Sequence, residues 1–210
     1  MKKFNKFHFK SFEFCEKKLE AKFHYSFDDE VFFEEIINFK NNWFKIRENF
    51  DLKTLNNILF HTHIALWISY YKIFPTKVLI IESGFIDDFQ INFWKKFYIN
   101  WLWEFLFTNK VSPKWLFNFI NNSNKKYTHW KKSSWGTKKD FISSNKALVA
   151  IWWWKDSIVS IELLKKANID FDLCVFWKID TLKENTIKIS WKNNLLIKRQ
   201  LSNNLFKLNS

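Results

Sequence analysis

Hydrophobic and polar residues alternate along the first 40 positions of the chain. Aromatic side chains recur at every second position with polar residues between them, and residues 26–30 (SFDDE) have the composition of a turn. A period of two places alternate side chains on one face of a strand. The segment is therefore predicted to form two or three antiparallel strands built on Phe7, Phe9, Phe12, Phe14, Phe23, Tyr25 and Phe27.

The spacing of apolar residues changes to three and four over residues 52–74, which predicts an amphipathic helix. Asp51 can cap its N-terminus, and Pro75 follows its end. Residues 77–81 (KVLII) have the composition of a short buried strand, and residues 88–107 that of a second amphipathic helix or a pair of helices. The first half of the chain thus predicts an α+β region of antiparallel strands and two helices.

Residues 121–146 are rich in Ser, Asn and Lys and lack periodicity, which indicates a linker or a long loop. Beyond them, short apolar runs alternate with helical spacings, an order typical of a parallel sheet with crossover helices. We expect an α/β protein with an N-terminal α+β domain at 1–120, the linker at 121–146, and the start of a nucleotide-binding domain at 147–210. Its expected strands are 147–151, 171–176 and 194–199, and its expected helices are about 157–167 and 180–190.

Composition narrows the class of protein. The chain has 210 residues, 47% hydrophobic and 26% charged, which suits a folded core and argues against global disorder. No apolar run approaches the roughly 18 residues of a membrane span, and no secretory signal is visible. We therefore expect a cytoplasmic protein with no membrane partner. Two distant cysteines, Cys15 and Cys174, are expected to be free thiols.

The net charge of +13 favours polyanionic partners, namely nucleic acid, nucleotides or a membrane surface. Heavy use of Lys, Asn, Ile and Phe is also the pattern that an AT-rich genome imposes on a protein of any function. Charge alone therefore does not identify a partner, and nucleic acid is not the partner that we expect.

Two residue types have exceptional frequencies. Glycine occurs 2 times and tryptophan 13 times, and together they make about 7% of the chain, the share that glycine alone usually has. A fold of this size needs glycine at turns and helix ends with positive φ. We hypothesise that the genome uses UGA for glycine and that many of these codons have been translated as tryptophan. The codons, or the intact mass of the native protein, test this directly.

Candidate chemistry lies between an expected strand and an expected helix. The candidate site residues are Trp152, Trp153, Trp154, Lys155, Asp156 and Ser157. With glycine at the three tryptophan positions, the backbone can approach phosphate oxygens closely, and the helix adds unpaired N–H groups and the positive end of its dipole. The lysine can neutralise phosphate charge, and the Asp-Ser pair can cap the helix. Three indoles would instead fill the volume that the phosphates require.

This segment resembles the PP-loop of the ATP pyrophosphatases, in which Ser or Gly leads the sequence Gly-Gly-x-Asp-Ser between a strand and a helix. Residues 152–157 match it, with Lys155 at the variable position, once the tryptophans are glycines. The resemblance implies ATP and Mg²⁺ as cofactors, with cleavage between the α and β phosphates. The structural alternative is a hydrophobic strand followed by an ordinary turn.

A wider resemblance covers nearly the whole chain. With glycine restored, residues 63–74, 93–107, 147–169 and 176–191 are similar to the ATP-dependent epimerases that act on UDP-N-acetylmuramoyl-L-alanyl-L-glutamate. Members of that family are longer, so we expect this chain to be an N-terminal fragment whose nucleotide-binding domain is incomplete. The resemblance leaves Trp94 as a genuine tryptophan. It assigns misread glycines to Trp67, Trp101, Trp103, Trp152, Trp153, Trp154, Trp177 and Trp191.

The resemblance implies inversion of the terminal L-glutamate to D-glutamate during peptidoglycan precursor synthesis, with the UDP-linked muramoyl dipeptide as the substrate. Adenylation removes the negative charge of the glutamate carboxylate, so that the α-proton can leave and return from the opposite face. Neither the base nor the acid that carries this proton can be named, and no metal-ligating side chain is assigned.

Other functions stay open at this point. Another PP-loop enzyme, such as a tRNA-modifying one, would adenylate a different substrate. A basic, aromatic-rich nucleic-acid-binding protein would use real tryptophans as stacking platforms on an exposed face. A chain with misread glycines would be inactive as written. A catalytic cysteine pair is not expected because Cys174 lies in an apolar strand, and His61 and His63 fall on different helix faces, which disfavours a metal pair.

Overall fold

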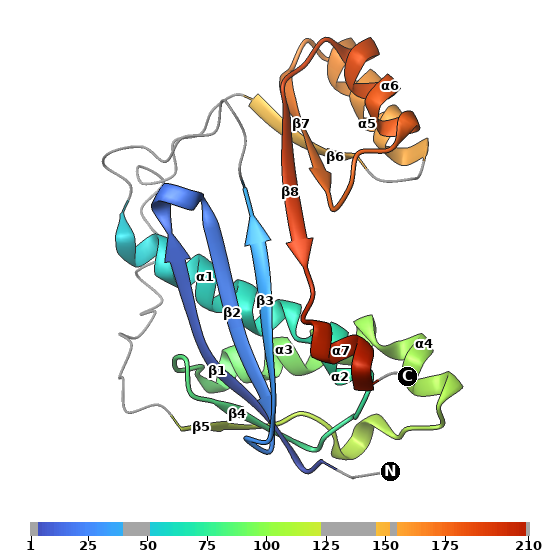
Figure 1. Ribbon diagram of the computed structural model, residues 1–210. Helices are drawn as coiled ribbons and strands as arrows, with labels where there is room; N and C mark the ends of the chain where they lie inside the picture. The colour runs from blue at the N-terminus through green and yellow to red at the C-terminus, as the bar shows by residue number, and fades with distance from the viewer. Residues whose placement is uncertain (1–3, 40–50, 123–145, 152–154, 209–210) are drawn as a thin grey trace.

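The computed structural model describes residues 4–39, 51–122, 146–151 and 155–208, and these residues form a mixed α/β fold (Figure 1). Eight strands from them make one sheet in the order β5-β4-β1-β2-β3-β8-β7-β6. The predicted α/β class is therefore confirmed. The strands are β1 (Lys6–Cys15), β2 (Glu20–Phe27), β3 (Val31–Asn38), β4 (Val78–Ile81), β5 (Asn118–Asn121), β6 (Lys146–Ile151), β7 (Asp170–Phe176) and β8 (Asn194–Gln200).

The N-terminal strands β1, β2 and β3 pair antiparallel in chain order, as their alternating pattern predicts. Phe7, Phe9 and Tyr25 are fully buried, and residues 28–30 form the turn between β2 and β3. Two parallel pairings extend this sheet, β4 beside β1 and β5 beside β4. Strand β5 was not predicted, because it has only four residues and one of them, Phe119, is buried.

The first half is helical where the sequence predicts it, except that the single helix expected over residues 52–74 is divided at Trp67 and ends at Tyr71. Asp51 caps the first helix by accepting hydrogen bonds from the backbone N–H groups of Lys53 and Thr54. Residues 88–107 form a helix pair that breaks at Leu102, so that alternative is confirmed. The bounds are η1 (Glu16–Lys18), α1 (Leu52–Leu66), α2 (Ile68–Tyr71), α3 (Asp88–Trp101), α4 (Trp103–Thr108) and η2 (Pro113–Trp115).

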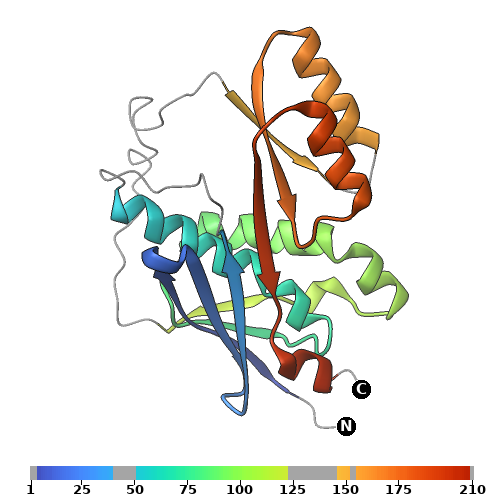
Figure 2. The same ribbon diagram turned by 45° about the horizontal axis from the view of Figure 1, so that its top comes forward.

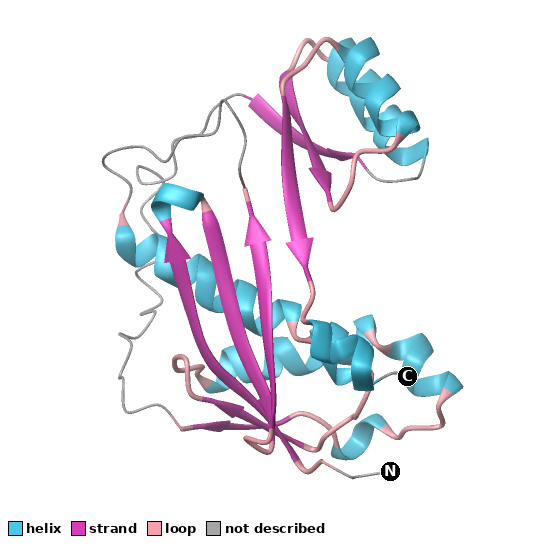
Figure 3. Cartoon of the chain, in the orientation of Figure 1, coloured by secondary structure: helices cyan, strands magenta, loops and turns pink. Residues whose placement is uncertain are grey.

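Helices α1 and α3 cover one face of the β1–β4 sheet (Figure 3). An aromatic core fills the space between them and includes the fully buried Tyr25, Trp67 and Tyr98. Rings pack edge to face here, for example Trp67 against Tyr98 with centroids 5.0 Å apart. Among the described residues, no helix covers the opposite face, which carries the polar positions of β1 and β2.

The second half alternates strand and helix as predicted, with every observed boundary within two residues of the expected one. Strands β6, β7 and β8 are parallel, and α5 (Lys155–Lys166) and α6 (Thr181–Ser190) lie on the same face of them (Figure 2). A separate small core of Val149, Ile161 and Phe171 packs beneath these helices. A further short helix, α7 (Asn203–Leu208), follows β8.

The two halves meet where β3 pairs antiparallel with β8 over three residue pairs. At this junction Arg199 of β8 donates through Nε to Glu35 of β3, whose side chain is fully buried. Leu205 of α7 packs into the N-terminal core. The predicted linker lies mostly outside the described residues, so the division into domains stays a prediction. No described helix is both long and apolar enough to cross a bilayer.

Candidate functional site

The predicted phosphate-binding segment lies at the carboxyl edge of the parallel strands. Strand β6 ends at Ile151, which pairs with Val175 near the end of β7, and α5 begins at Lys155. Residues 152–154, for which glycine was hypothesised, lie outside the described residues. In open α/β sheets, this edge is where ligands bind. The described residues therefore give the strand and the helix that the proposed loop would connect.

Helix α5 begins at Lys155, two residues earlier than predicted. Asp156 and Ser157 consequently belong to its first turn, and the capping role expected for them stays a prediction. The sequence placed the start too late because the apolar spacing begins only at Ile158. Lys155 and Asp156 are exposed, whereas Ser157 is buried. The backbone N–H groups of a first turn have no intrahelical acceptor, so this end of α5 suits an anion.

The turn from β7 into α6 follows the strand next to β6 in the sheet. The backbone N–H of Trp177 donates to the carbonyl of Ile197 at 2.8 Å. Asp180 caps α6, and its carboxylate lies 2.7 Å from Nζ of Lys183, a side chain that is 6% exposed. Hydrogen bonds from Lys183 hold the pKa of Asp180 below its usual range. This turn is thus held by a charge pair of its own beside the proposed loop.

Backbone angles differ among the tryptophans that the resemblance assigns to glycine. Trp177 has φ of 78° and Trp191 has φ of 53°, both in the left-handed region that favours glycine. Trp191 is the C-cap residue of α6, a common position for glycine, and its side chain is 92% exposed. Trp67 has an ordinary helical backbone with φ of −58° and is fully buried.

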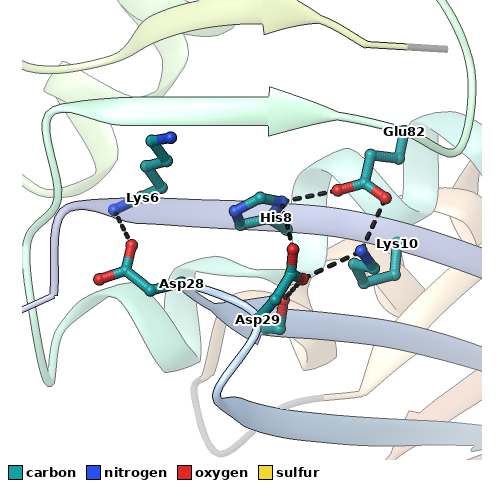
Figure 4. Close-up of polar contacts among 7 residues, drawn as sticks. Lys6, His8, Lys10, Asp28, Asp29 and Glu82 are labelled. Carbon is teal, nitrogen blue, oxygen red and sulfur yellow. Dashed lines mark hydrogen bonds and ion pairs between the residues drawn. The ribbon is translucent and has the colours of Figure 1, made fainter.

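The structure also brings together a polar group that the sequence did not indicate. We call it the His8 cluster: His8 and Lys10 of β1, Asp29 of the β2–β3 turn, and Glu82 just after β4 (Figure 4). His8 Nδ1 lies 2.6 Å from Glu82 Oε1 and 3.8 Å from Asp29 Oδ2. Lys10 Nζ lies 2.7 Å from Glu82 Oε2 and 3.0 Å from Asp29 Oδ1. Both carboxylates therefore share the same ammonium group.

Lys10 balances the charge of the two carboxylates in the His8 cluster. Burial alone would lower the pKa of Lys10, but hydrogen bonds to Glu82 and Asp29 outweigh it and raise that pKa. The hydrogen bond from Lys10, followed by one from Ser26, lowers the pKa of Asp29. His8, Asp29 and Glu82 present ligand atoms within 4.8 Å of one another, a spacing that would suit a cation. The ammonium of Lys10 already supplies the positive charge that a metal would bring.

Sequence reasoning missed this cluster because its members are far apart in the chain. Strand pairing unites them: His8 is opposite Ser26 in β2 and Ile80 in β4. The sequence contains one signal for this cluster: the alternating pattern places the polar positions of β1, including His8 and Lys10, on the face away from the aromatic core. From β1 to β6 there are five strand steps, or about 24 Å along the sheet at about 4.8 Å each. The His8 cluster is therefore too distant to touch a phosphate held at α5.

The remaining sequence candidates have structural roles. Cys15 is exposed, Cys174 is buried, and both are free, as predicted. His63 is fully buried and contacts Ser83 Oγ and the carbonyl of His24, both at 3.1 Å. Burial lowers the pKa of His63 to about 3, so this side chain is neutral. The expectation of no metal pair at His61 and His63 stays a prediction.

Comparison with known proteins supplies the family. A family model described as the MurL N-terminal domain matches residues 1–210. No curated protein and no solved structure matches the chain. The family match indicates a MurL-like epimerase role in peptidoglycan synthesis, in agreement with the resemblance found in the sequence. Because the model spans all 210 residues, this protein belongs to the MurL family and corresponds to its N-terminal domain.

Proposed function

We propose that this chain carries part of the ATP site of an epimerase that inverts the terminal L-glutamate of the UDP-linked muramoyl dipeptide. The site would comprise residues 152–157, between β6 and α5. The observation that carries this proposal is the arrangement of these two elements: a parallel edge strand that buries Val149 and Ile151, a three-residue connection, and a helix whose first turn faces the carboxyl edge of the sheet.

The described residues of this edge suit a nucleotide phosphate. The first-turn N–H groups of α5 can donate to phosphate oxygens, and the exposed Lys155 can approach them as a mobile cation. Asp156 is an exposed carboxylate in the same turn, a hard oxygen ligand of the type that Mg²⁺ prefers. Bound ATP would supply the adenylating group for the substrate carboxylate. The part of these residues is to hold and orient the phosphates.

The proposal requires glycine at 152–154, so it rests on the decoding hypothesis. Support comes from Trp177 and Trp191, whose positive φ angles are those that glycine adopts without strain. Residues other than Gly, Asn and Asp rarely adopt a left-handed backbone conformation, because it raises the free energy of the folded chain by about 1–2 kcal/mol per residue. The other described positions assigned to glycine do not share this feature, because Trp67 has a helical φ and Trp101 and Trp103 lie in helices. Positive φ also occurs at Leu19, Lys110 and Phe117, so the decoding hypothesis is tested by the codons and not by these angles.

The test compares two recombinant chains. One has glycine at all eight assigned positions, and the other keeps tryptophan only at 152–154. We expect ATP with Mg²⁺ to raise the melting temperature of the first chain and to leave that of the second unchanged, because indoles fill the phosphate volume. Circular dichroism establishes that both are folded. Equal stabilisation of both, or none in a folded all-glycine chain, would contradict the proposal.

Matched variants of the all-glycine chain then locate the site. Lys155→Ala is expected to weaken ATP binding about tenfold, whereas Lys166→Ala, at the other end of the same helix, should have no effect. Equal effects of the two substitutions would point to nonspecific attraction of ATP to a basic chain.

The substrate is tested by AMP release. Stimulation by the UDP-linked dipeptide supports the epimerase, and stimulation by tRNA would instead support the tRNA-modifying alternative. The nucleic-acid-binding alternative predicts tryptophans on one exposed face. Among the described residues, the exposed tryptophans come from three parts of the chain: Trp101 and Trp103 at the break between α3 and α4, Trp177 after β7, and Trp191 at the end of α6.

A further inference from the structure

Strand β6 lies at one end of the sheet, and its outer edge pairs with no described strand (Figure 1). Natural proteins protect such edges with charged side chains, proline, bulges or very short strands, because an open edge can pair with another chain. Strand β5, at the other end of the sheet, has only four residues, two of them asparagine. After Lys146, β6 continues as five apolar residues in an unbroken register with β7. Its outer edge is therefore suited to receive a further strand.

One face of the same strand is also uncovered. Val149 and Ile151 are buried in the small core with α5, whereas on the opposite face Leu148 is 60% exposed and Ala150 is exposed. The N-terminal core reaches that face only as far as Cys174 of β7, which pairs with Ala150 and is 3% exposed. Parallel sheets are almost always covered on both faces. Both α5 and α6 lie on the other face, so no described helix covers Leu148 and Ala150 (Figure 2).

We propose that β6 docks a further domain of the MurL family, through its outer edge and through the face that carries Leu148 and Ala150. The matched family model is described as an N-terminal domain, so members of the family carry at least one domain beyond it. The docked domain would add a strand parallel to β6. Crossovers that lead away from β6 on this side place their helices on the face opposite α5 and α6, because such crossovers are right-handed. One partner would thus pair the edge and cover the face.

Two other occupants suit this surface less well. A second copy related by a two-fold axis would pair β6 with β6 antiparallel, and its helices would cover its own strands and leave Leu148 and Ala150 exposed. Residues 123–145 of this chain lie outside the described residues. Their sequence is rich in Lys and Ser and lacks the apolar run that a parallel strand buried on both faces needs.

Docking at this edge would also complete the crevice at the carboxyl end of β6. In open α/β sheets, ligands bind outside the carboxyl ends of the strands, where the strand order reverses. Residues 152–157 follow β6 directly, so the added strand would form a second wall of the site proposed for ATP. This consequence rests on the proposed function, whereas the docking itself rests on the sheet edge and the family.

The experiment mixes this chain with a separately produced C-terminal domain of a MurL protein from the same source, without nucleotide, and measures association by titration calorimetry. Leu148→Lys places a charge on the surface that becomes buried, and it should weaken association at least about tenfold. The matched control is Leu163→Lys on α5, where the side chain is 61% exposed, and it should leave association unchanged. Melting temperatures establish that both variants are folded.

Hydrogen exchange gives a second measurement. Alternate residues of an edge strand direct their N–H groups away from the sheet. The amides of β6 that point away from β7 should therefore exchange rapidly in the chain alone and slowly once the domain is bound.

Several results would overturn the proposal. One is the absence of association, and another is an equal loss of association in Leu163→Lys. Slow exchange of every β6 amide in the dilute chain alone would show that a segment of this chain already occupies the edge. Protection that grows with the concentration of the chain alone would assign the edge to a second copy. Failure to bind ATP would contradict the proposed function and leave this inference intact, because every measurement is made without nucleotide.

Discussion

The junction between β3 and β8 depends on one buried ion pair. Glu35 is fully buried and accepts a hydrogen bond from Nε of Arg199. The guanidinium also donates to the carbonyl of Leu66 at 3.2 Å and to Ser69 Oγ at 3.0 Å. Arg199→Met removes this cation and leaves a carboxylate in the interior. Breaking a buried pair in this way costs about 3–5 kcal/mol of the free energy of unfolding.

A double-mutant cycle separates the pair from its surroundings. Replacing both partners, as Glu35→Leu with Arg199→Met, removes the isolated charge and should return stability to within about 1 kcal/mol of the parent or above it. Urea unfolding followed by circular dichroism gives each free energy. The control is the exposed pair of Lys188 and Glu184, 2.9 Å apart, in which Lys188→Ala should cost less than about 0.5 kcal/mol.

The pH dependence gives a second measurement of the same variant. Burial raises the pKa of Glu35 even though Arg199 opposes the shift, so loss of the guanidinium should raise it further. A carboxyl with a raised folded-state pKa binds its proton more tightly when folded, so stability falls as pH rises above the unfolded value. The deficit of Arg199→Met should therefore shrink between pH 7 and pH 5. A deficit below about 1 kcal/mol at pH 7, or one independent of pH, would refute this account of the junction.

Further predictions concern positions that the structure singles out. Trp191→Gly should raise the free energy of unfolding in urea by about 1 kcal/mol, because glycine adopts the left-handed backbone at 191 without strain. Trp101→Gly should lower it, because glycine destabilises a helix. The reverse order would count against misread glycine at 191. His63, with a pKa of about 3, stays neutral in the fold while the unfolded chain takes up a proton. Stability should therefore decline as pH falls below about 6.5, by up to about 1.4 kcal/mol per pH unit, and His63→Gln should remove this contribution. Lys10→Met should create a binding site for a divalent cation at Asp29 and Glu82, so Zn²⁺ should raise the melting temperature of the variant only. An equal rise in the parent would show that the Lys10 ammonium does not compete with the cation for the two carboxylates.

Local pattern was sufficient for most of the secondary structure. The alternation of Phe7 and Phe9 predicted β1, and Asp51 and Pro75 marked the helical region between them, because period and capping are properties of neighbouring residues. The strand and helix on either side of the proposed phosphate loop were also predicted, although α5 begins two residues early because Lys155 and Asp156 give no apolar signal.

Tertiary structure decided what depends on distant residues. The sequence alone established the strand and helix order and the family resemblance. It could not establish that β3 joins β8 through Glu35 and Arg199, or that His8 meets Glu82, since strand register brings together residues up to 164 positions apart. Nor could it show which side of α3 is buried, since both sides of that helix are aromatic and only packing against the sheet distinguishes Tyr98 from Phe93.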